Sequence, residues 1–487
     1  MKHNNENTAA VASIEDVADC TARADAQVSA VLRRVMAQRR SAAVASAYVA
    51  ALAPGVKANC WALAESAGHD GWGRMQGLLS SYRWDWADLR AELPALAVAW
   101  VPDAEGDLIG PGIAIDETAQ LKHGDATACA APQHAGCTGH VENCVTTVFS
   151  AYVTANGQAW ADFDVYMPER WAADLARRRA AGIPDDLEFA TKPQLAMNQL
   201  GRLTAAGLPA RWVAFDEVYG RSEKLRKKAA KAGLAYATII PRDYLITLPS
   251  RTAIRADQAV KDAVFERRSC GNGSKGPRYS DWAMIATGIG GQCLLIRRLI
   301  SRPDSCTFYL CWAPPGRPAT MTCFITIAGR RWPVEETFKT GKDVLGWDQA
   351  QARTWDGVCR HTALSALAQL RAAAIRGALT SAITLPAGGH ADATPPGDGV
   401  SDADLRIPLG DAPVPARGGQ PCPPAITPIK LSIAETTRLA SLAAQYTAGL
   451  ISRARLAFAL RWSLRRRLHQ AIARWHHYST RLLAWTG

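Results

Sequence analysis

The sequence contains no run that approaches the length of about 18 apolar residues that a membrane-spanning helix needs. Its first seven residues (MKHNNEN) are polar and no apolar signal region follows them, so we expect a cytoplasmic protein rather than a secreted one. The 12 cysteines are scattered over 487 residues and do not form a compact disulfide framework, which fits a reducing compartment. The glycine-rich piece 288–291 lacks the strand–turn–helix context and the lysine of a nucleotide-binding loop, so we expect no ATP site.

Positive charge is what the chain has in excess. Its formal net charge of +12 and isoelectric point near 9.2 indicate a polyanionic partner, with nucleic acid first and an anionic membrane surface second. A hydrophobic fraction of 48% is ample for a core, and 487 residues suit two or three structural units.

Helical periodicity dominates the beginning of the chain. Residues 1–25 are polar and alanine-rich, and we expect a loosely ordered tail there. Residues 26–105 carry apolar side chains at three- and four-residue spacing, which predicts an all-helical domain. Arginines interleaved with tryptophans in this domain could contact DNA or could form an ordinary solvated face.

The period changes between residues 106 and 240. The sequence predicts a buried strand ending at Asp116, a hairpin that turns at Asn156-Gly157, a helix over 193–207, and a strand over 211–215 followed by Asp216. A cationic helix and a short strand complete the segment. This order is expected of the first part of a ribonuclease-H-like α/β core.

The second half is more varied. Residues 241–330 predict a β-rich insertion with strands near 294–296, 306–312 and 322–327, and residues 331–384 predict the helical second part of the core. Residues 385–428 are rich in Pro, Gly and Ala and predict a disordered linker. Residues 429–487 predict a basic helical region that includes Arg465, Arg466 and Arg467 among aromatic side chains, which suits DNA more than a membrane or a plain surface role.

One helix stands out near the start of the segment 331–384. Pro333 suits its first turn, and Arg331, Glu335 and Lys342 are spaced four and seven apart, so they lie roughly along one face. A carboxylate between two cations suits a phosphate-handling site. An ordinary amphipathic helix with ion pairs would show the same pattern.

Three motifs carry a resemblance to a known family. Residues 331–336 (RWPVEE), with Lys342 seven after Glu335, resemble the Arg…Glu…Lys signature of DDE transposases of bacterial insertion sequences. Residues 115–124 (IDETAQLKHG) and 212–220 (WVAFDEVYG) resemble the same family, in particular its insertion sequence 701 branch. The resemblance runs from about residue 40 to the C-terminus. The chain departs from the fuller signature at Ala328, where the family has a tyrosine.

The resemblance implies the chemistry of the chain. Asp116, Asp216 and Glu335 would be the catalytic carboxylates and would hold Mg²⁺ or Mn²⁺, with two ions about 4 Å apart clamping an in-line displacement at phosphorus. Arg331, Lys342 and, more weakly, Lys122 would contact DNA phosphates. Their neighbours Glu117, Glu217 and Glu336 stay open as ligands in place of the chosen acids.

The resemblance also implies the partners. The helical residues 26–105 lie where the family has its terminal-repeat-binding region, so we expect them to be a DNA-binding domain. The enzyme would bind double-stranded DNA at terminal inverted repeats, join the cut ends to target DNA, and act as a homodimer on paired ends in association with the nucleoid. Two alternatives stay open: a DNA-binding repressor or architectural factor that no longer cuts, and a metal-dependent nuclease without strand transfer. Cys129, His134, Cys137, His140 and Cys144 are loosely zinc-like, but their spacings match no standard finger, so we expect no zinc site.

Overall fold

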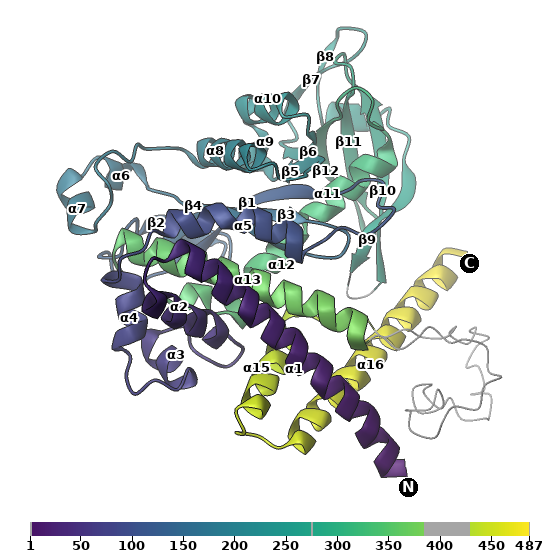
Figure 1. Ribbon diagram of the computed structural model, residues 1–487. Helices are drawn as coiled ribbons and strands as arrows, with labels where there is room; N and C mark the ends of the chain where they lie inside the picture. Colours follow the sequence, from purple (N-terminus) through teal and green to yellow (C-terminus); the bar gives the residue numbers. More distant parts are fainter. Residues whose placement is uncertain (1, 274–275, 384–428, 487) are drawn as a thin grey trace. The chain divides into compact units, whose positions relative to one another are not determined.

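The computed structural model describes residues 2–273, 276–383 and 429–486 (Figure 1). The chain divides into two compact units. We call the one formed by Val28–Gly271 and Tyr279–Ala373 the sheet unit, and the one formed by Met1–Gln27, Asn272–Arg278 and Ala374–Gly487 the helical unit. The linker expected at 385–428 lies outside the described residues. Within the described ranges, no helix is both long and apolar enough to cross a membrane.

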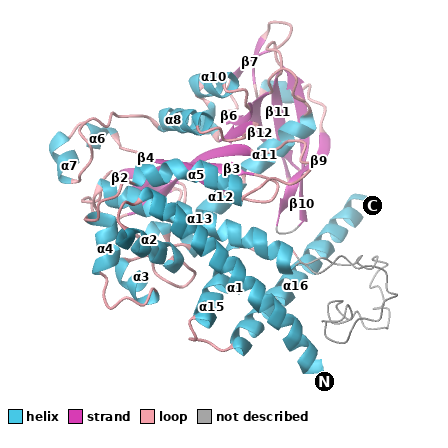
Figure 2. Cartoon of the chain, viewed as in Figure 1, coloured by secondary structure: helices cyan, strands magenta, loops and turns pink. Residues whose placement is uncertain are grey.

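A large mixed β-sheet organises the sheet unit (Figure 2). Ten strands join in the order β2-β3-β1-β5-β6-β12-β11-β10-β9, with β4 paired to β3. Strand β1 is antiparallel to β3 and parallel to β5, which is in turn parallel to β6. The strands of this sheet are β1 (Gly112–Leu121), β2 (Ala131–Ala135), β3 (His140–Val153), β4 (Gln158–Val165), β5 (Trp212–Phe215), β6 (Ala235–Ile240), β9 (Glu266–Gly273), β10 (Gly276–Ala286), β11 (Gln292–Leu299) and β12 (Arg302–Trp312).

The mixed α/β fold is confirmed, and it is consistent with a ribonuclease-H-like core. The predicted hairpin is β3–β4, and its turn is closed by the Thr154 N–H, which donates to the Gly157 carbonyl. The β-rich segment expected at 241–330 contains strands, but it is no sheet of its own. Strand β12 pairs antiparallel with β6 and so continues the same sheet, and only the short pair β7 (Leu245–Thr247) and β8 (Ala253–Arg255) is separate among the described strands.

Helices cover both faces of the sheet. Adjacent residues of a strand point to opposite faces. Ser150 on β3 donates to Gln199 of the helix α8 (Lys192–Ala205). Its neighbour Phe149 has its ring centroid 5.8 Å from that of Phe338 on the helix α12 (Pro333–Lys339). Helices α8 and α12 therefore lie on opposite faces. The helices and helical turns that follow β4 in the sheet unit are α6 (Glu169–Ala172), α7 (Leu175–Ala180), α8 (Lys192–Ala205), α9 (Glu217–Gly220), α10 (Glu223–Lys231), η1 (Gln258–Val260), α11 (Met321–Arg331), α12 (Pro333–Lys339), η2 (Thr340–Val344), η3 (Trp347–Gln349) and α13 (Trp355–Ile383).

The predicted helical region 26–105 is helical, and nearly all of it belongs to the sheet unit. The Tyr48 hydroxyl donates to Nδ1 of His361 at 2.8 Å, and His361 Nε2 lies 2.9 Å from the Trp347 carbonyl, so a buried polar link joins this region to α13. Its helices after α1 are α2 (Arg39–Ala51), α3 (Cys60–Ser66), α4 (Gly73–Ser80) and α5 (Trp86–Trp100).

The helical unit has its own apolar core, formed by parts of α1 (Lys2–Val35), α13, α15 (Ile433–Thr447) and α16 (Arg453–Thr486). Helix α1 replaces the loosely ordered tail that the sequence predicted for 1–25. Ile14 and Val17 are buried in this core against Leu439 and its neighbours. The polar and alanine-rich composition concealed a narrow apolar stripe at helical spacing.

Two further predictions were wrong. The strand expected at 322–327 is the helix α11, which Thr320 caps by accepting from the Cys323 N–H. Its β-branched residues have a local preference for a strand. The helix forms nevertheless, because it packs against β1, β5 and β6. The helix expected over Arg331–Lys342 does begin with Pro333 in its first turn, as predicted, but Arg331 is the last residue of the preceding helix α11. Lys342 lies in the π-helical turn η2.

Candidate active site

Strand register brings two predicted acids together. In the parallel pair β1–β5, Ile115 lies opposite Phe215, so the next residues, Asp116 and Asp216, emerge side by side. Strand β5 ends there, as predicted. Strand β1 does not end at Asp116, because it stays paired with β3 as far as Leu121.

Asp216 is fixed by the turn that follows β5. Its side chain caps the short helix α9 by accepting from the backbone N–H groups of Val218 (2.9 Å) and Tyr219 (3.3 Å). The last residue of α9 is Gly220, and a Cβ there would lie 2.0 Å from the Ile239 carbonyl oxygen on β6. The turn that carries Asp216 can therefore pack this closely on the sheet only with glycine at position 220.

Arg331 links Glu335 to Asp116 by hydrogen bonds to both carboxylates. Arg331, at the end of α11, donates from Nη1 to Oδ2 of Asp116 at 3.0 Å and from Nη2 to Oε1 of Glu335 at 2.8 Å. One guanidinium thus bridges an acid on the sheet and an acid on α12. The contact between Arg331 and Glu335, four residues apart, survives the break between the two helices.

The helix that carries Glu335 is anchored by buried polar contacts. Trp160 on β4 donates its indole N–H to the Thr337 hydroxyl at 2.9 Å, and the Gln369 side-chain amide donates to the Thr337 carbonyl at 3.0 Å. Gly341 in the following turn leaves room for the Trp160 ring, since a Cβ there would lie 2.3 Å from it. These contacts position Glu335 from the far side of its helix.

Burial and neighbouring negative charges raise the pKa values of the carboxyl groups in the site. Burial raises the pKa of Asp116 to about 7; the Arg331 guanidinium opposes this increase, and the Asp216 and Glu117 carboxylates add to it. Burial and Glu117 also raise the pKa of Asp216. Burial opposes the protonation of Arg331, yet Asp116, Glu335 and Asp216 together raise its pKa above the ordinary value. The cluster holds more negative charge than one arginine can offset.

A comparison with known protein families shows which family this chain belongs to. A model of the DDE superfamily endonuclease family matches residues 27–287, which is more than half of the chain and includes Asp116 and Asp216. The chain belongs to the DDE superfamily endonucleases. No curated protein matches it.

Endonucleases of this superfamily generally use divalent metal ions, and the donors here have the right chemistry. Asp116, Asp216 and Glu335 offer carboxylate oxygens, the ligands that Mg²⁺ and Mn²⁺ prefer. Within the described part of the chain, however, no three acidic, histidine or cysteine side chains are grouped closely enough to hold an ion. The Arg331 guanidinium lies between Asp116 and Glu335. Shared coordination of an ion by all three acids therefore requires Arg331 to release at least one of them.

Each neighbouring acid that the sequence left open is engaged elsewhere in this endonuclease. Glu117 accepts from Lys192 at 2.8 Å and from the hydroxyl of Tyr219. The other two form contacts near the surface: Glu217 pairs with Arg221 at 2.6 Å, and Glu336 accepts from Gln158 at 3.2 Å. These partly buried contacts of Glu117 beside the acids were not predicted from the sequence, because they join three separate segments of the chain.

The predicted DNA-contacting lysines lie in different surroundings. Lys122 donates to the Ala350 carbonyl at 2.8 Å, and burial lowers its pKa to about 8. It lies six residues beyond Asp116, which is about 20 Å along a strand. Lys342 is half-exposed and has no side-chain partner among the described residues.

The three predicted arginines of α16 belong to the helical unit and differ in exposure. Arg465 is exposed, and Arg466 is exposed with Glu435 at 3.8 Å. Arg467 is buried and donates to the Ile429 carbonyl at 3.4 Å, and burial lowers its pKa. Helix α16 contains eight arginines and no acidic residue, so its exposed side is positively charged.

Proposed function

We propose that this endonuclease is a DNA transposase in which Asp116, Asp216 and Glu335 are the catalytic residues. The single observation that carries the proposal is their convergence. Strand register places Asp116 beside Asp216, and Arg331 ties Asp116 to Glu335 across more than 200 residues of sequence. A buried group of like charges is costly unless it has a cationic partner, which favours a working site over a structural one.

The three acids and the groups that orient them have different proposed roles. Asp116, Asp216 and Glu335 would hold Mg²⁺ or Mn²⁺, in our proposal two ions, which supply Lewis-acid activation of water or a DNA 3′-hydroxyl at phosphorus. Asp216 is oriented by the N–H groups of α9, and Glu335 by the Thr337 contacts of α12. These contacts hold the Asp216 side chain and the helix that carries Glu335 before substrate arrives, so the rearrangement that metal binding still requires is the release of a carboxylate by Arg331.

DNA phosphates would be held by cations outside the carboxylate group. We propose Lys342, seven residues after Glu335, and Arg465 on α16, because the first has no partner among the described side chains and the second is exposed. Arg466, which is also exposed, would assist from the same helix. Phosphate contacts by Arg331, Lys122 or Arg467 would require these residues to exchange the hydrogen bonds that they now make.

We further propose that the enzyme acts on terminal inverted repeats and target DNA as a homodimer, and that it belongs to the insertion sequence 701 branch with a ribonuclease-H-like core. The motifs around Asp116, Asp216 and Glu335 support this assignment. The size of the complex on end-containing DNA measures the dimer directly.

The decisive experiment measures cleavage of a supercoiled plasmid that carries the DNA flanking this gene, with Mg²⁺ or Mn²⁺. We expect cutting at the element ends by the wild type and none by Asp216→Asn or Glu335→Gln, with DNA binding retained by both. Glu217→Gln and Glu336→Gln change the adjacent acid in each motif and should leave cutting intact. Cutting that survives Asp216→Asn and Glu335→Gln would overturn the site. Specific end binding without any cutting by the wild type would instead favour a DNA-binding repressor or architectural factor.

A further inference from the structure

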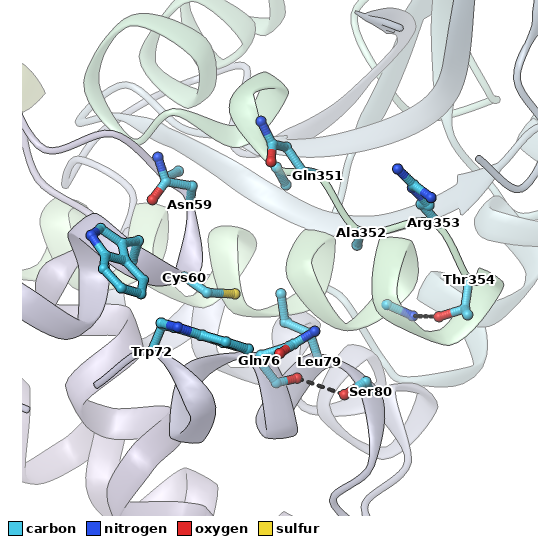
Figure 3. A pocket seen from close by; sticks show the side chains of 14 residues that line it. Asn59, Cys60, Trp72, Gln76, Leu79, Ser80, Gln351, Ala352, Arg353 and Thr354 are labelled. Atoms are coloured by element: carbon cyan, nitrogen blue, oxygen red, sulfur yellow. Dashed lines mark hydrogen bonds between the residues drawn. The ribbon is translucent and has the colours of Figure 1, made fainter. Parts of the chain in front are cut away.

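A cavity of about 690 Å³ opens in the sheet unit, and none of the residues given a catalytic role lines it. One wall comes from α3 and α4 with the segment before α3, and the other comes from residues 350–354 and Gly357. Figure 3 shows Trp72 and Gln76 on one side and Gln351 and Arg353 on the other. Ala350 accepts from Lys122, which is about 20 Å along β1 from Asp116, so the cavity is separate from the acids.

Two tryptophans make the cavity unusual. The side chains of Trp61 and Trp72 are 66% and 42% exposed, and their ring centroids lie 6.3 Å apart with the planes tilted by 36°. Large aromatic side chains usually bury most of their surface. An exposed pair at the edge of a hollow is therefore a surface suited to a flat apolar ligand.

Three side-chain amides, those of Asn59, Gln76 and Gln351, line the same cavity as the two tryptophan rings. Asn59 lines the cavity and its side-chain oxygen accepts from the Ala62 N–H at 2.9 Å, so its side-chain N–H groups are not used in that bond. Gln76, Gln351 and Arg353 have no side-chain partner among the described residues. No acidic side chain belongs to the described lining, and Arg353 is its one charged member.

These groups match the chemistry of a nucleotide within a strand. A nucleobase offers a flat face for the tryptophans and an edge of donors and acceptors for the amides, and the attached phosphate suits an arginine. In double-stranded DNA the faces are stacked on neighbouring base pairs, so only an unpaired base can offer one to the protein. We propose that this cavity binds an unpaired base of a DNA strand, with Trp61 and Trp72 as the stacking surface and Arg353 at its phosphate. The proposal rests on the proposed function for the identity of the polymer, but it does not depend on cleavage.

The test uses binding in EDTA, where cutting does not interfere. The probe is a fluorescein-labelled oligothymidylate of 12 nucleotides, and the comparison probe is an abasic oligomer of the same length, which keeps the phosphates and lacks the bases. By fluorescence anisotropy we expect Trp72→Ala to bind oligothymidylate about tenfold more weakly than the wild type, the loss typical of one stacking contact. Trp72→Phe should bind nearly as the wild type, and the abasic oligomer should bind wild type and Trp72→Ala equally.

Two further variants separate the cavity from general effects. Gln351→Ala changes the opposite wall and should also weaken oligothymidylate binding, whereas Arg74→Ala removes an exposed cation of α4 outside the lining and should weaken both probes alike. Thermal unfolding of each variant verifies that it is folded. Equal losses on both probes for Trp72→Ala, or no loss at all, would overturn the proposal. So would competition by free thymidine monophosphate as strong as that by the oligomer, because the cavity would then be a site for a free nucleotide.

The failure of this inference and the failure of the proposed function are distinguishable. If cutting requires Asp216 and Glu335 but Trp72→Ala binds both probes normally, only the cavity assignment falls. If no metal-dependent cutting occurs but the base-dependent loss is found, only the catalytic assignment falls.

Discussion

Replacing Asp116 by asparagine tests whether the carboxylate group is electrostatically strained. The pKa of Asp116 is about 7 in the folded protein against 3.8 for an unperturbed carboxyl. Each pKa unit corresponds to about 1.4 kcal/mol, so the ionised carboxylate lowers the stability of the metal-free fold by about 4 kcal/mol at most. Asparagine keeps a side-chain oxygen that can accept from Arg331 and carries no charge to desolvate.

The sign follows from which state holds the proton. Between about pH 4 and pH 7 the folded protein keeps a proton on Asp116 that the unfolded chain has released, so wild-type stability falls as pH rises and levels off above pH 7. The Asp116→Asn variant lacks this loss. We therefore expect it to be more stable than the wild type above pH 7, with the difference shrinking towards zero near pH 4.

The assay is denaturant unfolding in EDTA across this pH range, followed by tryptophan fluorescence. Glu217→Gln is the matched control, because it removes an exposed carboxylate paired with Arg221 and should change stability by less than about 1 kcal/mol at every pH. Adding Mg²⁺ at pH 8 should stabilise the wild type more than Asp116→Asn. A variant that is less stable than the wild type at pH 8, or a gain that does not vary with pH, would refute the reasoning.

Three further outcomes are expected. Gly220→Ala should lower the melting temperature and cleavage together, since its Cβ would lie 2.0 Å from the Ile239 carbonyl oxygen and overpacking typically costs about 1–3 kcal/mol. Burial lowers the pKa of His361 from 6.5 to about 4, so on acidification the unfolded chain takes up a proton before the folded protein does. The free energy of unfolding should therefore fall by about 3 kcal/mol as the pH drops from 6.5 to 4. Denaturant unfolding of His361→Gln should not show this loss. On α16, Arg465→Ala should reduce DNA affinity and its salt dependence, because Arg465 is exposed. Arg467→Ala should instead lower the melting temperature, because Arg467 donates to the Ile429 carbonyl.

Local patterns predicted the elements that are stabilised locally. The hairpin β3–β4 has a turn signal between two apolar runs, and β5 is an apolar run that stops at Asp216. Both follow from alternation and turn chemistry within one short segment. The pairing of Asp116 with Asp216 could also be anticipated, because each follows an apolar run and the two runs pair in parallel, although β1 itself continues past Asp116.

The errors arose where distant contacts decide the structure. Residues 322–327 have the β-branched composition of a strand, yet they form α11 because one side of that helix packs on the sheet. Gly329 on this helix shows how close the packing is, since a Cβ there would lie 2.0 Å from the Cys270 carbonyl oxygen. Likewise, nothing near Asp116 in the sequence indicates that β1 continues to Leu121; its partner β3 decides that.

The role predicted for Arg331 from the sequence can be compared with the contacts that it makes in the structure. The sequence pattern suggested a phosphate contact, and the structure pairs the same guanidinium with Asp116 and Glu335. The two roles are compatible, because a guanidinium presents several donors in a fixed plane and stays charged in either setting. Without a metal ion, the arginine offsets part of the repulsion that raises the pKa of Asp116. Divalent cations on the carboxylates would supply that compensation in its place, and the released guanidinium would then lie beside the acids, where the proposed reaction would bring a DNA phosphate.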